Sequence, residues 1–199
     1  MPLHLPDPPH GAPDEVRSKL REFADHSRFS TEGLRNASPD QLDVSTPHQV
    51  FTIGLDDLAA GRGLEAAQPV GWRYIVEAAG QPIASAETTV GADGTTHHLS
   101  QLTEGPYVEA TALGVRAARQ LPELEAAGFE LRLLRIPAVY LMALWLHSPT
   151  TDLMVPLAPS PIGREGRITP LPAFMNELTR LARSANPPDR PGASGSHAP

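Results

Sequence analysis

The stretch that decides the fold is IPAVYLMALWL, residues 136–146. Beyond Pro137 it is apolar at both odd and even positions, which is typical of a strand covered on both faces of a sheet. Pro137 would remove a ladder hydrogen bond in mid-strand, so we expect the chain to bend there. The stretch lies between an alternating segment, residues 129–135, and a second apolar piece, residues 153–157. Together these pieces predict a hairpin over residues 129–157 that carries the centre of the core.

A three-stranded meander is expected upstream, over residues 72–102. Residues 72–78 alternate in polarity, and the turn residues Ala79-Gly80-Gln81 follow them. The second turn is Gly91-Ala92-Asp93-Gly94, and Asp-Gly between two strand-like runs is a strong hairpin signal. Residues 49–55 (QVFTIGL) predict one further strand before the meander.

Three segments show helical spacing. Residues 14–26 place Val16, Leu20 and Phe23 on one face, so they predict a short amphipathic helix. Residues 106–121 are helical and place small residues on one side, which would let the helix backbone lie close to a sheet. Residues 170–183 carry an apolar stripe behind a proline at the first helical position.

The order of these elements predicts an α+β fold. We expect a single antiparallel sheet of five to seven strands, with the 106–121 helix packed on one face and terminal helices at about 14–26 and 170–183. The order is similar to that of small secretion-chaperone-like folds and, less closely, of profilin-like folds. This resemblance is one of element order, and a shared fold does not define a function.

The folded part is expected to be one domain, residues 14–184. Residues 1–13 contain five prolines, and residues 185–199 are mostly proline, glycine, serine and alanine. Such segments bury too little apolar surface to offset the entropy of ordering them. We therefore expect a disordered tail at each end.

Charge and composition argue against several classes of function. Acidic residues outnumber basic ones 23 to 16 and the net charge is −7, so binding to nucleic acid or to anionic lipid is not expected. The chain has no cysteine, which excludes disulfides, thiolate nucleophiles and the common structural zinc sites. No secretory signal and no apolar run of about 20 residues is visible, so a cytoplasmic protein is expected.

No catalytic, cofactor-binding or metal-binding motif emerges. His97 and His98 are adjacent in a predicted strand, so their side chains should point to opposite faces and cannot share a metal without a bulge. The vicinal Asp56 and Asp57 are better explained as the capped start of a short helix. No phosphate-binding loop and no Gly-x-Ser-x-Gly elbow occurs.

Two hypotheses of function remain. The first is a non-enzymatic protein-binding or accessory module, chaperone-like in character, that acts through a sheet edge or face and has a protein partner or forms a homodimer. The second is a small-molecule-binding protein or enzyme with a pocket between the 106–121 helix and the sheet. The candidate pocket or interaction residues are Trp72, His97, His98, Glu104 and Tyr107. Trp72 could be an exposed binding anchor, although core packing is the better interpretation.

Overall fold

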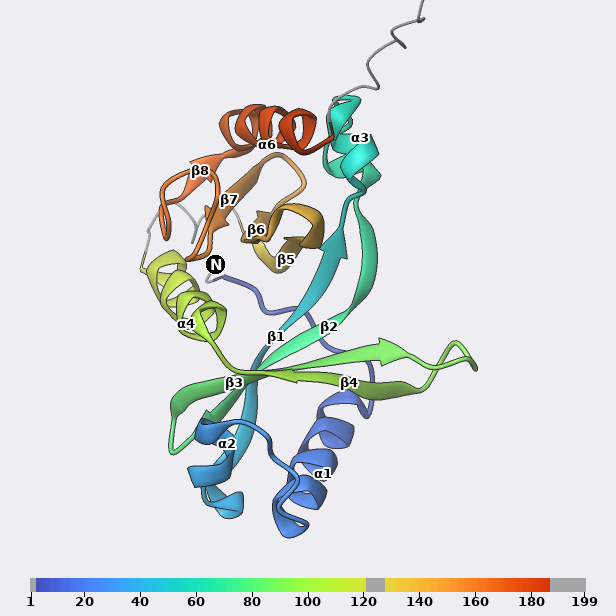
Figure 1. The fold of residues 1–199 in the computed structure, drawn as a ribbon, viewed down its shortest axis with the longest axis vertical. Helices are drawn as coiled ribbons and strands as arrows, with labels where there is room; N and C mark the ends of the chain where they lie inside the picture. The colour runs from blue at the N-terminus through green and yellow to red at the C-terminus, as the bar shows by residue number, and fades with distance from the viewer. Residues whose placement is uncertain (1–2, 121–127, 187–199) are drawn as a thin grey trace, which may run out of the picture.

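Eight strands form one twisted sheet with helices on both faces in the computed structural model, which describes residues 3–120 and 128–186 (Figure 1). The strands are β1 (Leu42–Thr52), β2 (Gln68–Ala78), β3 (Gln81–Val90), β4 (His97–Thr103), β5 (Glu130–Ile136), β6 (Leu141–His147), β7 (Asp152–Pro156) and β8 (Thr169–Pro170). The helices are α1 (Ala12–Asp25), α2 (Glu32–Asn36), α3 (Leu55–Ala59), α4 (Pro106–Arg119) and α6 (Leu171–Ala185). Three short 3₁₀ turns are η1 (Pro39–Gln41), η2 (Leu64–Ala66) and η3 (Pro137–Val139).

The sheet is mixed, with the strand order β4-β3-β2-β1-β5-β6-β7-β8. Its strand pairs are antiparallel except for β1 and β5, which run parallel with Val50 beside Leu133. The α+β class is therefore confirmed, but a purely antiparallel sheet of five to seven strands is wrong in detail. Because α4 carries the chain from the edge strand β4 back to the middle of the sheet, β5 enters parallel to β1, and parallel pairing requires such a crossover.

The apolar stretch that decides the fold is extended and interior from Leu141 onward, as predicted, but residues 137–140 form a turn in which Tyr140 is 84% exposed. Its strand, β6, has core residues on both faces: Trp145 belongs to one apolar cluster and Leu144 to another. The expected break occurs at Pro137, which opens η3, and the chain re-enters the sheet after Tyr140, a residue in the left-handed region with φ 52°.

Helices cover both faces of the sheet. On one face α4 packs over β5, β6 and β7, with Val115 and Ala118 in the buried cluster. The opposite face is covered in two places, by α1 beneath the β1–β4 half and by α6 with α3 beneath the β5–β8 half (Figure 1). Each of these helices has one apolar stripe, and burying it fixes the side of the sheet on which the helix lies.

The small residues of α4 allow the close approach that the sequence predicts. A Cβ atom on Gly114 would lie 2.8 Å from Cδ1 of Leu144 on β6, so the helix backbone lies against the strand with no room for a side chain. This contact holds the whole helix, and therefore its N-terminus, at a fixed height above the sheet.

The N-terminal segment, for which we expect disorder over residues 1–13, is described from residue 3 onward. Leu3 is 6% exposed within the core cluster under α4, and the His4 amide donates to the Phe129 carbonyl at 2.8 Å. These contacts differ from the expected tail. Of the predicted C-terminal tail, residues 187–199 lie outside the described residues. Within residues 3–120 and 128–186, no helix has the length and apolar character needed to cross a bilayer.

Candidate functional site

The residues singled out from the sequence do not form one site. Glu104 and Tyr107 lie together at the junction of β4 and α4, where both line a small cavity. His97 lies at the other end of β4, in an open cleft of about 490 Å³ beside the start of α1. His98 is exposed, and Trp72 is half-buried against the core cluster under α1.

The cavity lies between the start of α4 and the sheet and has a volume of about 60 Å³. Its walls include two guanidinium groups, those of Arg73 and Arg135, together with the carboxylates of Glu87 and Glu104. Pockets that take metabolites typically measure about 300–1,000 Å³. This cavity therefore has room for water or a small ion, and not for a metabolite.

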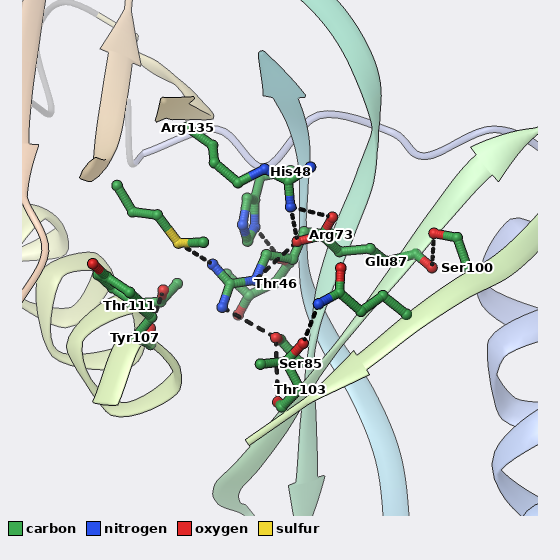
Figure 2. Close-up of polar contacts among 12 residues, drawn as sticks. Thr46, His48, Arg73, Ser85, Glu87, Ser100, Thr103, Tyr107, Thr111 and Arg135 are labelled. Carbon is green, nitrogen blue, oxygen red and sulfur yellow. Dashed lines mark hydrogen bonds and ion pairs between the residues drawn. The ribbon is translucent and has the colours of Figure 1, made fainter. Parts of the chain in front are cut away.

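Arg73 is at the centre of the polar contacts (Figure 2). It lies on β2, is 2% exposed, and donates to Ser85 Oγ at 3.1 Å and to the Met142 sulfur at 3.6 Å. Its Nε lies 4.0 Å from the Glu87 carboxylate and has no hydrogen-bond partner among the described residues. Burial lowers the pKa of Arg73, Glu87 opposes this change and Arg135 adds to it. A guanidinium nevertheless stays charged in proteins, so Arg73 is a buried cation with weak partners.

The Glu87 carboxylate is committed to Arg135. Nη1 of Arg135, on β5, donates to both carboxylate oxygens, at 2.9 and 2.7 Å. The Glu87 side chain is 13% exposed and that of Arg135 is 25% exposed, so the pair is largely desolvated. Charge-assisted contacts of this kind are among the stronger hydrogen bonds in proteins. One carboxylate thus lies between two guanidinium groups, and the trio keeps one excess positive charge.

His48 lies beside this trio on β1, directly across from Arg73 in the strand register. It is completely buried, and its Nδ1 donates to the Thr46 carbonyl at 2.7 Å. Burial lowers the pKa of His48 to about 3, with a further lowering from the charge of Arg73. The imidazole is therefore neutral at physiological pH. Thr46 itself adopts φ 52° at a bulge in β1, which turns its carbonyl toward the ring.

Tyr107 fixes the start of α4 against two loops. Its hydroxyl shares one hydrogen between the carbonyl oxygens of Tyr140 and Pro159, at 2.9 and 3.0 Å, and Thr111 Oγ1 donates to the Tyr107 carbonyl at 2.6 Å. Burial raises the pKa of Tyr107, and the nearby Glu165 raises it further. With its hydroxyl used in this way, Tyr107 positions the helix.

Glu104 fixes α2 in a similar way. Its carboxylate accepts hydrogen bonds from the backbone amides of Gly33 at 3.2 Å and Leu34 at 2.8 Å. Burial alone would raise the pKa of this carboxyl, but the hydrogen bonds outweigh burial and the pKa is lowered. The Glu104 carboxylate therefore lines the cavity and at the same time accepts hydrogen bonds from the amides of α2.

The arrangement does not resemble a nucleophile with its base. Ser85 Oγ accepts from Arg73 and is directed toward the Thr103 carbonyl at 3.5 Å, and no described hydrogen bond links it to His48. No group of three or more His, Asp or Glu side chains in the described part of the chain is placed to hold a metal ion. What the site offers is a buried guanidinium, that of Arg73, with no short contact to a carboxylate, beside a second guanidinium and two carboxylates that have other partners.

A charged residue in an alternating strand, such as Arg73, would be assigned to a solvated face, but its side chain is 2% exposed. Arg132 lies on the opposite face from Arg135, with its guanidinium 4.9 Å from the Trp145 ring centroid and 5.2 Å from that of Phe51. The feature of the sequence that could have indicated this pair is the hairpin, because Arg73 on β2 lies directly opposite Glu87 on β3. The sequence does not show that α4 covers this pair.

A second feature is the edge of the sheet formed by β4. This strand, HHLSQLT, has seven residues, no proline and no Asp, Glu, Lys or Arg. The opposite edge, β8, is two residues long and includes Pro170. Ser100 is the extra residue at a bulge against β3, where its hydroxyl donates to the Glu87 carbonyl at 3.0 Å. Figure 1 shows the β3–β4 hairpin reaching beyond the rest of the sheet.

Comparison of the chain with protein-family models, curated proteins and solved structures finds no match.

Proposed function

We propose that this chain is a non-enzymatic protein-binding or accessory module that pairs its β4 edge with an extended segment of a partner protein. The observation that carries the proposal is the difference between the two ends of the sheet. β8 is short and contains a proline, whereas β4 is a seven-residue strand with exposed side chains at His98, Ser100, Gln101 and Thr103.

Proteins normally protect a sheet edge, because its unpaired amides and carbonyls can pair with another chain. The usual devices are short strands, charged side chains, proline and bulges, and β4 has only the bulge at Ser100. Strand addition at such an edge uses main-chain hydrogen bonds for affinity and alternate side chains for specificity. An edge left in this state is best explained by a partner that covers it.

The surroundings of β4 favour a basic partner segment. The open cleft at the His97 end of the strand is lined by Asp14 and Glu15 of α1, and the whole chain carries a net charge of −7. An extended segment with Lys or Arg near one end would place its cations beside these carboxylates. Complementary charge of this kind raises the association rate and fixes the register of pairing.

The alternative function, a small-molecule-binding protein or enzyme with a pocket between the helix and the sheet, has less support. The 60 Å³ cavity is too small for a metabolite. A larger hollow of about 370 Å³ beside α4 is open, and its lining is mainly alanine, glycine, leucine and proline. It offers few polar groups to orient a ligand, so protein binding is the stronger proposal.

Site-specific photo-crosslinking tests the proposal. A photoreactive residue is placed at Ser100, on the β4 edge, and in a matched variant at Arg180, an exposed position on α6. Both proteins are expressed in the native host and irradiated, and the crosslinked peptides are sequenced.

The proposal predicts that position 100 forms a crosslink to one defined segment, either of another protein or of a second copy of this chain. Position 180 should not form that crosslink. Equal labelling from both positions, or no adduct from position 100, would contradict it.

A further inference from the structure

We propose that the cavity beneath the start of α4 binds one small monovalent anion, such as chloride or formate, between the Arg73 guanidinium and the N-terminus of the helix. This proposal is separate from protein binding at β4 and does not depend on it. It rests on three observations: a buried cation without an adequate partner, a helix N-terminus directed at the same cavity, and a volume that suits a small ion.

The buried cation is Arg73. Its two partners, the Ser85 hydroxyl and the Met142 sulfur, are uncharged, and its Nε has no hydrogen-bond partner among the described residues. The nearest carboxylate, Glu87, is 4.0 Å from that Nε and accepts both of its short hydrogen bonds from Arg135. Removing a charge from water is costly unless it is paired, so a counter-ion beside Arg73 would stabilise the folded protein.

The helix N-terminus supplies the second donor group. The 14-residue α4 begins after Gly105 without a side-chain cap, and Gly105, Tyr107 and Val108 line the cavity. Gly105 has φ 129°, a conformation that side-chain-bearing residues rarely adopt, and it lets the chain turn abruptly from β4 into the helix. Pro106 has no amide hydrogen and the Val108 amide donates to the Gly105 carbonyl at 3.1 Å, so the terminus offers an anion the Tyr107 amide and the positive end of the helix dipole.

Two carboxylates oppose an anion here, and each has its own partners. Glu87 is held by Arg135, and Glu104 accepts from the Gly33 and Leu34 amides of α2. The cavity of about 60 Å³ is large enough for roughly two waters, at about 30 Å³ each in the liquid, or for one chloride or formate ion. Water is the competing occupant, and it would leave Arg73 with only the 4.0 Å contact to Glu87 as an ionic partner.

An anion series separates these occupants. Thermal unfolding is measured at constant ionic strength while sodium gluconate, whose anion is too large for the cavity, is replaced stepwise by sodium chloride or formate. Binding to the folded state predicts a rise in Tm that follows a saturation curve, about 3–6 °C when the anion is at ten times its Kd. Arg73→Met should abolish the saturable rise, whereas Arg132→Met, on the other face of the sheet, should keep it.

A crystallographic measurement covers the case in which Arg73→Met does not fold. Wild-type crystals are grown in bromide, and anomalous scattering locates the ion. A bromide peak within the cavity near Arg73, together with the saturable rise in Tm, supports the proposal. Ordered water alone in the cavity, or a Tm that is the same in chloride, formate and gluconate, would overturn it.

Discussion

Arg73 shows how much one side chain can depend on its neighbours. It is 2% exposed, and the carboxylate of Glu87 lies 4.0 Å from its Nε while accepting shorter hydrogen bonds from Arg135. Replacing a buried charged residue by a neutral one is costly when it leaves other buried charges unpaired, and Glu87 is the carboxylate whose loss would do this. The stability of this part of the sheet therefore depends on the carboxylate of Glu87 more than on either arginine.

Substitution of Glu87 tests that dependence. Glu87→Gln keeps the size of the side chain but leaves two guanidinium groups facing each other, so we expect a loss of about 3 kcal/mol in the free energy of unfolding. The matched control is Glu130→Gln, because Glu130 pairs with Arg132 at 2.7 Å in a more exposed setting, where the loss should stay below about 1 kcal/mol. Urea unfolding of both variants measures the difference, and equal losses would contradict this account of the trio.

His48 makes a prediction about pH. Its pKa is lowered from 6.5 to about 3 in the folded protein, so the unfolded chain binds a proton in that interval and the folded protein does not. Stability from this residue is complete above pH 6.5 and falls as the pH drops toward 3. Between pH 7 and pH 5 the free energy of unfolding of the wild-type protein should fall by about 2 kcal/mol more than that of His48→Gln.

Chemical denaturation at the two pH values measures this loss. His98→Gln is the matched variant, because it makes the same substitution at an exposed histidine. A wild-type protein whose stability changes with pH no more than that of His48→Gln would show that His48 is not buried in its neutral form.

At the scale of elements, the contact between α4 and β6 sets the height of the helix above the sheet. Gly114→Val would force a side chain into the space occupied by Leu144, and overpacking of this kind typically costs about 1–3 kcal/mol. Ala117→Val, on the exposed side of the same helix, introduces the same side chain without the clash. Thermal unfolding should show a clear loss of stability for the first variant and a loss below about 1 kcal/mol for the second.

The sequence predicted elements better than it predicted their pairing. The interior strand over residues 141–147 and the close-packed helix over residues 106–119 follow from local patterns, since apolar positions and small residues are visible in the chain itself. β1 begins at Leu42, earlier than expected, because residues 42–45 pair with β2 ahead of a bulge at residues 46 and 47. The parallel pairing of β1 and β5 has no local signature, since it joins segments about 80 residues apart.

The candidate site was harder to predict for the same reason. Glu104 and Tyr107 lie together because they flank one strand-to-helix junction, which is visible in the sequence. Arg73, Glu87, Arg135 and His48 come from four different strands, and only the packing of α4 over them makes them a buried group. A charged residue in an alternating strand is normally assigned to solvent, and nothing in the local sequence indicates a helix above it.

At the scale of the whole molecule, the two edges of the sheet differ in how well they are protected against pairing with another strand. β8 is two residues long and includes a proline, whereas β4 has seven residues, no proline, no Asp, Glu, Lys or Arg, and a bulge at Ser100. Placing lysines on an edge strand is a known way to prevent edge pairing. The double variant Ser100→Lys with Gln101→Lys should therefore weaken partner binding at least about tenfold, which is about 1.4 kcal/mol.

The control for this variant is Thr89→Lys, which adds an exposed charge to β3, the strand inside the edge. Calorimetric titration with the segment identified by crosslinking measures all three proteins. Unchanged affinity in the double lysine variant would place the partner elsewhere on the surface.

The most direct test of the proposed function is amide hydrogen exchange over residues 97–103, compared between the free protein and its complex with the crosslinked partner segment. In the free protein, amides on the open side of β4 should exchange fast, because no strand among residues 3–120 and 128–186 pairs with that side. In the complex they should slow by about tenfold or more, while exchange in β8 stays the same. Slowed exchange elsewhere in the molecule, with β4 unaffected, would contradict strand addition at this edge.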